Sequence, residues 1–280
     1  MPPIRKRRIT TSDGVVLNLL EAGSGVPLFL VHGWSQSAAL FRHQLEGLSN
    51  RYRVMALDLR GHGESEKPGH GYRVARLATD VRDAIDQLDL EAVAVLGHSM
   101  GNAVLWSHLE LFGSHRLSKL IIAEQPPTLF AHPSWSKPER ERAGCVTDGE
   151  DLGKTLDSLV GEDAENFAAE FVEGMLSAGV SADDRRFIVE ENLRMPRAAA
   201  AQLLQDTSTA DWRDLIPRIE LPTLIIAGRA SLVPFASQAW MQQQVPGSRL
   251  VGFEASEGGS HFMFWENPEK FNRVVADFLG

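Results

Sequence analysis

Short, mostly apolar runs alternate with helical patterns along much of the chain, and this alternation limits the possible folds more than any other feature. The runs lie at residues 15–20, 27–31, 53–57, 92–96 and 120–123. A strand that is buried on both faces of a sheet has this appearance. Between two of the runs, residues 74–88 carry apolar side chains at helical spacing. Alternating strands and helices predict an α/β fold, with a mostly parallel, twisted sheet and helices on both faces.

The pattern changes in the second half of the chain. Between Pro126 and Leu215 we find helical patterns but no strand. Helices are expected there at residues 165–177, 183–193 and 197–205. Further on, strands are expected at residues 223–227 and 249–253 and a helix at residues 268–279. We therefore expect an α/β core made of residues 1–125 and 216–280, interrupted by a helical insertion of residues 126–215.

Composition and charge exclude several classes of protein. The net charge of −9 argues against nucleic acid as a partner, because binding phosphates requires positive charge. We expect the basic run at residues 5–8 to be a solvated entry to the first strand. No run of about 18 apolar residues is present, so no membrane span is expected.

The cysteine count and the N-terminus bear on the compartment. Cys145 is the single cysteine, so no intrachain disulfide can form, and no apolar segment follows the basic N-terminus as in a signal peptide. A cytoplasmic location is therefore expected. Neither a metal-binding cluster nor a dinucleotide fingerprint occurs, so we expect no metal and no cofactor. The sequence does not predict an oligomeric state.

A serine motif follows the fourth apolar run. Residues 97–101 read Gly-His-Ser-Met-Gly, directly after the run at residues 92–96 and before an expected helix at residues 102–111. A serine at such a strand-to-helix turn is held in a strained conformation, and the small flanking residues let the backbone close up around it. The positive end of the following helix would favour an oxyanion beside Ser99. These features predict that Ser99 is a nucleophile.

Three further motifs lie where strands are expected to end. Residues 32–34 read His-Gly-Trp after the run at residues 27–31, and we expect His32 to be structural. Residues 58–65 form a glycine-rich turn that begins with an aspartate, also expected to be structural. Near the C-terminus, residues 258–261 read Gly-Gly-Ser-His before the last helix. Histidine suits a general base because its ordinary pKa lies near neutrality, so the position of His261 singles it out.

Together these motifs resemble the α/β-hydrolase superfamily, and most closely its small bacterial esterase, lactonase and haloperoxidase-like members. The resemblance spans nearly the whole chain. It implies an α/β-hydrolase fold in which residues 126–215 form a helical cap between the sixth and seventh strands. It also implies that Ser99 is the nucleophile, that His261 is the general base, and that the backbone N–H groups of Trp34 and Met100 form the oxyanion hole.

The acid of the predicted triad departs from the usual pattern. Many family members carry it three residues beyond the glycine that ends the seventh strand, but this position holds Ser231, which cannot supply a negative charge. Glu124, at the end of the sixth strand, is the substitute we expect, since some families of this fold place their acid there. The alternative is that Glu124 is a hinge or surface carboxylate.

A serine at the elbow narrows the reaction. It suits acyl transfer through an acyl-enzyme, so hydrolysis of a carboxylic ester or lactone is the expected function. A cofactor-independent dioxygenase acting on a hydroxyquinolone-like heteroaromatic is one alternative, since such enzymes share the fold; there His261 and Glu124 would deprotonate the substrate. A non-enzymatic ligand receptor on the same fold is the other alternative.

The substrate is expected to be a small, partly apolar molecule. The large apolar side chains of the insertion include aromatic residues that can line a pocket over Ser99. Those that we expect to bind substrate are Phe130, Trp135, Phe167, Phe171 and Trp212. Some of the large apolar side chains must instead pack the insertion onto the core, which is the commoner fate of such residues.

Overall fold

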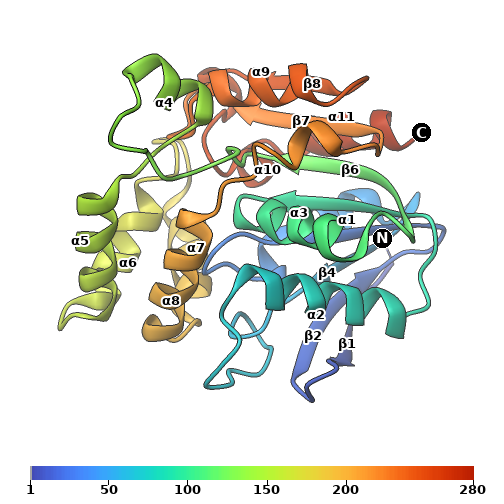
Figure 1. Cartoon of the computed structure of the whole chain (residues 1–280). Helices are drawn as coiled ribbons and strands as arrows, with labels where there is room; N and C mark the ends of the chain where they lie inside the picture. The colour runs from blue at the N-terminus through green and yellow to red at the C-terminus, as the bar shows by residue number, and fades with distance from the viewer. Residues whose placement is uncertain (1) are drawn as a thin grey trace.

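One eight-stranded sheet organises the molecule (Figure 1). The computed structural model describes residues 2–280, and its strands lie in the order β1-β2-β4-β3-β5-β6-β7-β8. The strands are β1 (Arg5–Thr10), β2 (Val16–Ala22), β3 (Val26–Val31), β4 (Tyr52–Leu57), β5 (Val93–His98), β6 (Leu117–Ala123), β7 (Thr223–Gly228) and β8 (Arg249–Phe253). Strand β2 pairs antiparallel with β1 and β4, and every other pair is parallel. The α/β class and the mostly parallel sheet are therefore confirmed.

The edge strand β1 is the part of the sheet that the sequence did not predict. Its basic residues form a strand that pairs with β2, where a solvated entry was expected. In β1 only Ile9 is buried, so the run lacks the apolar character from which the inner strands were predicted. Charged side chains on an edge strand also discourage pairing with another chain.

Helices cover both faces of the sheet. The core helices are α1 (Arg42–Leu48), α2 (Val74–Gln87), α3 (Met100–Phe112), α9 (Phe235–Gln244), α10 (Met263–Glu266) and α11 (Pro268–Leu279). Strand β3 illustrates how the layers form, because its alternate residues belong to two separate apolar clusters. Phe29 and Val31 pack with α2 and α3, whereas Leu28 and Leu30 pack with α1 and α11. Burial on both faces explains the continuous apolar runs.

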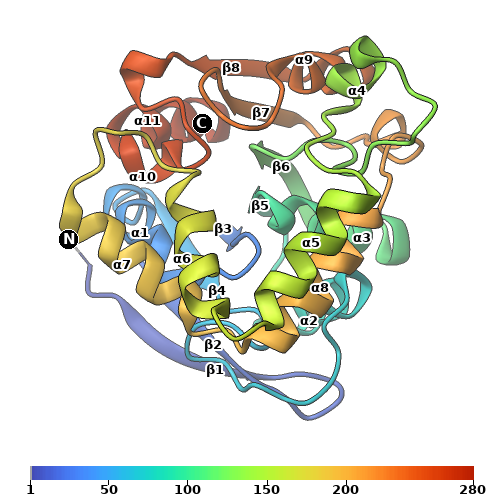
Figure 2. The ribbon, with the colours of Figure 1, turned by 90° about the vertical axis from the view of Figure 1, so that its left-hand side faces the viewer.

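The helical insertion lies between β6 and β7. Its helices are α4 (Lys137–Ala143), α5 (Gly149–Val160), α6 (Ala164–Glu173), α7 (Ala182–Leu193) and α8 (Arg197–Thr209). Figure 2 looks onto the side where α5 to α8 surround the ends of β3, β5 and β6. Helix α6 stops before Gly174, four residues short of the expected end. No helix within residues 2–280 has both the length and the apolar character needed to cross a bilayer.

Candidate active site

Ser99 occupies a sharp turn between β5 and α3. Its backbone has φ 51° and ψ −129°, a conformation that costs a non-glycine residue about 1–3 kcal/mol. Close packing holds the turn: a Cβ on Gly101 would collide with the Val31 carbonyl, and one on Gly97 would meet the Asn102 side chain. The Ser99 N–H also donates to the carbonyl of Ala123, at 2.9 Å. The glycines of the serine motif are therefore required by the packing of this turn.

Two backbone N–H groups beside Ser99 have no protein acceptor. Gly33 lies against Ser99, since a Cβ added to it would be 3.0 Å from the Ser99 Cβ. Its own N–H donates to Gln36 Oε1, at 3.0 Å. Across residues 2–280, however, the N–H groups of Trp34 and Met100 donate to no protein atom. Met100 is also the first residue of α3, where the helix dipole favours negative charge, so both groups are free to bind an oxyanion.

Two buried histidines fix the loop that carries Trp34. His32 Nε2 accepts from the Leu59 N–H at 3.1 Å, and its Nδ1 donates to the Gly33 carbonyl at 2.8 Å. His62 Nε2 accepts from the Ser35 N–H at 3.2 Å. Burial lowers the pKa of both imidazoles, so both are neutral near pH 7. These contacts explain both histidines as structural residues.

The same loop is hydrogen-bonded to the helical insertion. Trp34 Nε1 donates to the carbonyl of Ala200 in α8, at 2.8 Å. Ser35 Oγ donates to the carbonyl of Asn192 in α7, at 2.9 Å. Residues from the core and from the insertion therefore fix the position of the free Trp34 N–H together.

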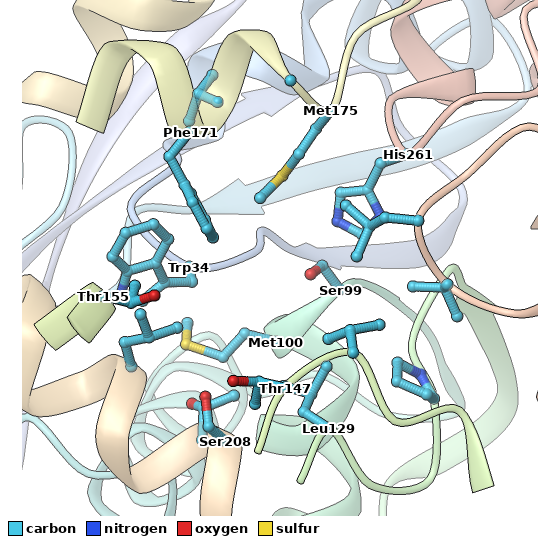
Figure 3. Close-up of a pocket in the computed structure, with 18 of the residues that line it drawn as sticks. Trp34, Ser99, Met100, Leu129, Thr147, Thr155, Phe171, Met175, Ser208 and His261 are labelled. Carbon is cyan, nitrogen blue, oxygen red and sulfur yellow. The ribbon is translucent and has the colours of Figure 1, made fainter. Parts of the chain in front are cut away.

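His261 lies in the loop after β8 and faces the same cavity as Ser99 (Figure 3). Its carbonyl accepts from Nε2 of His98, at 2.8 Å, and the two rings are 4.8 Å apart. Burial lowers the pKa of His261 to about 4, so the imidazole is neutral and able to accept a proton at pH 7. Its Nδ1 has no partner. Within the described chain no hydrogen bond joins Ser99 to His261.

Glu124 follows β6 in a left-handed conformation, with φ 55°, and its side chain is wholly buried. Its Oε2 accepts from the N–H of Gly228, at 2.6 Å, while Oε1 has no partner. Burial raises the pKa of Glu124 to about 8, although the Gly228 N–H and the Ser231 hydroxyl favour the ionised form. Among residues 2–280, neither a hydrogen bond nor an ion pair joins Glu124 to His261.

Four other acids, which lie before β7 or between β8 and His261, form ion pairs elsewhere. Glu254 pairs with Arg229 at 2.8 Å, and Glu257 pairs with Lys270 at 2.6 Å. Asp211 and Asp214 pair with neighbouring arginines before β7. Glu124 differs from all four because it is wholly buried and leaves a carboxylate oxygen unpaired.

A cavity of about 460 Å³ connects these groups with the insertion. Its wall includes Ser99, His261, Trp34 and Met100, which the structure therefore brings together. Of the five aromatic residues expected to bind substrate, Phe171 alone lines it. Its ring stands edge-on to the Trp34 ring, with the centroids 5.7 Å apart.

The structure corrects the expectation for the other four aromatic residues. Phe167 stacks on Phe171, and Trp212 packs beside Trp106 in the core. Trp135 lies under the Arg213 guanidinium, and the backbone of Phe130 forms a bridge with Thr147. Helical periodicity identifies an apolar face but does not reveal whether that face meets the core or a cavity.

Most of the polar lining of the cavity was not predicted from the sequence. The missed side chains that carry uncharged polar groups are Gln36, Gln125, Thr147, Thr155, Thr207 and Ser208. One signal was present in the sequence, because Thr207 and Ser208 are adjacent hydroxyl residues. The structure places both in α8 and buries them. Polar residues on the inner side of a helix indicate either an internal hydrogen bond or a ligand site.

The chain is similar to known proteins in both sequence and fold. A sequence profile of the alpha/beta hydrolase fold matches residues 26–268. The AB hydrolase superfamily protein YisY of Bacillus subtilis is 28% identical over 275 residues, covering 96% of this chain and 97% of YisY. A bromoperoxidase from Bacillus anthracis has a TM-score of 0.89 at 25% identity, covering 98% of this chain and 99% of that one. An esterase from Exiguobacterium antarcticum has a TM-score of 0.88 at 26% identity, with the same coverage.

Proposed function

Because the chain belongs to the α/β hydrolase fold family and is an enzyme of that class, we propose that it cleaves a carboxylic ester or lactone through an acyl-enzyme at Ser99. One observation carries the proposal. Ser99 stands on a strained turn beside two N–H groups without acceptors, in a cavity that it shares with a neutral, buried histidine. A nucleophile, oxyanion donors and a base are the parts that acyl transfer requires.

In the acylation step, His261 takes the proton of Ser99 as Oγ attacks the carbonyl carbon of the ester. The carbonyl oxygen becomes negatively charged, and the N–H groups of Trp34 and Met100 stabilise it. When the tetrahedral intermediate collapses, the bond to the leaving alcohol breaks and His261 gives that alcohol its proton. The acyl group is then bound to Ser99 as an ester.

Deacylation repeats the same steps with water. His261 takes a proton from a water molecule, whose oxygen attacks the acyl carbon. The acid leaves and Ser99 recovers its proton from His261. The buried position of His261 favours its neutral form, which is the form that both half-reactions need at the start.

Glu124 is the acid that we assign to this pair. Its Oε1 and the Nδ1 of His261 are both buried and both lack a partner. A rotation of the side chains that joins them would satisfy both atoms, and ionised Glu124 would then hold Nδ1–H and stabilise the imidazolium. The N–H of Gly228 keeps the other carboxylate oxygen in place.

An acyl-enzyme at Ser99 is compatible with the activities named for both similar structures, the esterase and the bromoperoxidase. Water cleaves an acyl-enzyme to a carboxylic acid, whereas hydrogen peroxide cleaves it to a peracid, which can oxidise bromide. An esterase activity and a bromoperoxidase activity are thus both compatible with acylated Ser99. If peroxide reacts here, bromination that depends on acetate and peroxide should disappear in Ser99→Ala.

Labelling with a fluorophosphonate tests the proposal directly. We expect the probe to modify Ser99, as mapped by mass spectrometry, and to block hydrolysis of p-nitrophenyl butyrate. A dioxygenase would instead consume O₂ in the presence of a hydroxyquinolone. Its Ser99→Ala variant would retain much of this O₂ consumption. A receptor would bind ligand without turnover. Either of these last results would contradict the proposed hydrolase.

A further inference from the structure

The cavity has hydroxyl groups at the end away from His261. They belong to Thr147, which precedes α5, to Thr155 in α5, and to Thr207 and Ser208 in α8. Figure 3 shows Thr147, Thr155 and Ser208 on the opposite side of Ser99 from His261. We call these four residues the hydroxyl cluster. Trp34 and Met100 line the wall on the same side of Ser99 as the cluster (Figure 3).

We propose that the hydroxyl cluster selects substrates whose acyl chain ends in an uncharged hydrogen-bonding group, such as a hydroxyl. The proposal rests on the ester hydrolysis proposed above. His261 must give its proton to the leaving alcohol, so the alcohol lies on the His261 side of Ser99. The acyl chain then extends toward the cluster on the other side.

Thr207 provides the strongest support. Its side chain is buried, at 3% exposure, and its Oγ1 has no hydrogen-bond partner. Helical threonines usually satisfy this group by donating to the carbonyl four residues earlier. Thr155 donates to the Asp151 carbonyl at 2.9 Å, and Thr209 donates to the Gln205 carbonyl at 3.0 Å. Thr207 makes no such bond, so its buried hydroxyl has no partner within the protein although the residue lines the cavity.

Ser208 adds a second hydroxyl at the same end. It is also 3% exposed, and its Oγ makes no hydrogen bond with another atom of residues 2–280. The buried Thr207 hydroxyl, which has no internal partner, loses the hydrogen bonds that water would offer it. A polar group on the substrate would restore these bonds, whereas a methyl group would not. The cluster can therefore distinguish a substrate that ends in a polar group from one that ends in a methyl group.

Charge in the cavity excludes carboxylates. Within the described chain, no lysine or arginine lines the wall, while Asp151 and Glu170 do, and both are exposed. A substrate carboxylate would enter an apolar cavity without a cationic partner and would meet two like charges at its rim. The polar group that the cluster accepts is therefore neutral.

Three p-nitrophenyl esters of matched length test this selection. The heptanoate ends in a methyl group, the 6-hydroxyhexanoate replaces that methyl by a hydroxyl, and the adipate monoester ends in a carboxylate. After correction for spontaneous release, we expect kcat/KM for the hydroxy ester to exceed that for the heptanoate about fivefold or more. We expect the adipate monoester to react at least about 100-fold more slowly than the hydroxy ester.

Variants of the cluster show whether it causes the preference. Thr207→Val keeps the shape of the side chain and removes its hydroxyl, so the ratio of hydroxy ester to heptanoate should fall about fivefold, to near one. Ser208→Ala, which also removes a hydroxyl, should lower the same ratio. Thr209→Val is the matched control, because Thr209 is exposed in the same helix and does not line the cavity. Its ratio should equal that of the wild type.

The outcomes separate the two proposals. If the wild type hydrolyses none of the esters and p-nitrophenyl butyrate neither, the hydrolase function fails and the selection fails with it. If the wild type hydrolyses butyrate and heptanoate but disfavours the hydroxy ester, or if Thr207→Val and Ser208→Ala leave the ratio unchanged, the hydroxyl cluster proposal alone is overturned. Because each ratio is taken within one variant, partial loss of folded protein does not affect it.

Discussion

The carboxyl ends of β6 and β7 are neighbours in the sheet, but the residues that follow them differ in charge and in burial. Beyond β6 the chain turns through a left-handed conformation at Glu124, whose side chain is wholly buried. Beyond β7, Arg229 and Leu232 are exposed and Ser231 is only partly covered. The two ends are joined, however, since the Gly228 N–H donates to Glu124. The β7 end thus supplies a hydrogen bond to a carboxylate that the β6 end carries.

In the site that we propose, the carboxylate lies beyond β6, where many other family members carry it beyond β7. Parallel strands end at the same edge of the sheet, so a carboxylate on either one lies near the same loops. Burial favours the neutral form of Glu124 and hydrogen bonds favour its ionised form. The balance of these effects sets the ionisation of Glu124. It therefore decides whether a carboxylate after β6 can replace one after β7.

The largest expected effect concerns the nucleophile that both strand ends would serve. Ser99→Ala should reduce kcat for p-nitrophenyl butyrate by on the order of 10³-fold or more, because no acyl-enzyme can form. Its melting temperature should stay close to that of the wild type, since the change leaves no core cavity. Turnover within tenfold of the wild type would show that neither strand end serves a serine hydrolase.

The next effect contrasts the two ends directly. Glu124→Gln keeps the shape of the side chain but removes its charge, and we expect kcat to fall by about 10²–10⁴-fold. Ser231→Asp in the Glu124→Gln background restores a carboxylate on the β7 side and should recover part of the activity.

Two control variants make this contrast decisive. Glu254→Gln and Glu257→Gln alter acids that are paired with Arg229 and Lys270, so kcat should remain near that of the wild type. If either variant lost most of its activity while Glu124→Gln kept it, the acid would lie in the loop before His261. The assignment of Glu124 would then be wrong.

A pH dependence should follow from the raised pKa of Glu124, about 8. Activity should rise with pH as the carboxylate forms, with an apparent pKa at or below 8, because pairing with His261 favours the ionised form. Stability should change in the opposite direction. The folded protein holds this proton more tightly than the unfolded chain, so the stabilisation present at low pH is lost as pH rises toward 8.

The window from pH 6.5 to 8 isolates this effect. The pKa of His261 is lowered to about 4, so its own effect on stability is an increase with pH that ends near the ordinary value of about 6.5. Thermal unfolding above that pH should therefore show a decline in the wild type that is absent in Glu124→Gln. Equal slopes in the two proteins would mean that Glu124 is already ionised when folded.

The smallest expected effect comes from the β7 end alone. Ser231→Ala removes a hydroxyl that favours ionised Glu124, so the pKa of the carboxyl should rise further. We expect a shift of the pH–activity curve to higher pH and a loss of no more than about threefold at its plateau. A loss as large as that of Glu124→Gln would assign the main role to Ser231.

The sequence predicted the parts of the fold that have a strong periodic or local signal. Strands β3 to β7 were recognisable because each is a short apolar run buried on both faces. The turn at Ser99 was recognisable because its glycines cannot carry a side chain there. Strand β1 lacked both signals. Its side chains are mostly charged, and the backbone hydrogen bonds that pair it with β2 cannot be recognised from the composition.

The lining of the cavity could not be predicted in the same way. Phe167 and Phe171 share one helix and one apolar face, yet only Phe171 lines the cavity. Which residue does so depends on how α6 packs against Trp34 and α7, which is a property of the whole fold. For similar reasons the sequence could name Glu124 as a carboxylate at a strand end, but not its burial or its bond with Gly228.

The hydrogen bonds from Trp34 and Ser35 to the helical insertion have a consequence for protein engineering. Exchanging residues 126–215 for the corresponding segment of another protein is an obvious way to alter substrate range. Such a graft would remove the Ala200 and Asn192 carbonyls that accept from these side chains. A chimera built without matching acceptors would carry an intact serine and histidine beside a loosened loop. Successful grafts should therefore transfer the loop of residues 32–37 together with the helices.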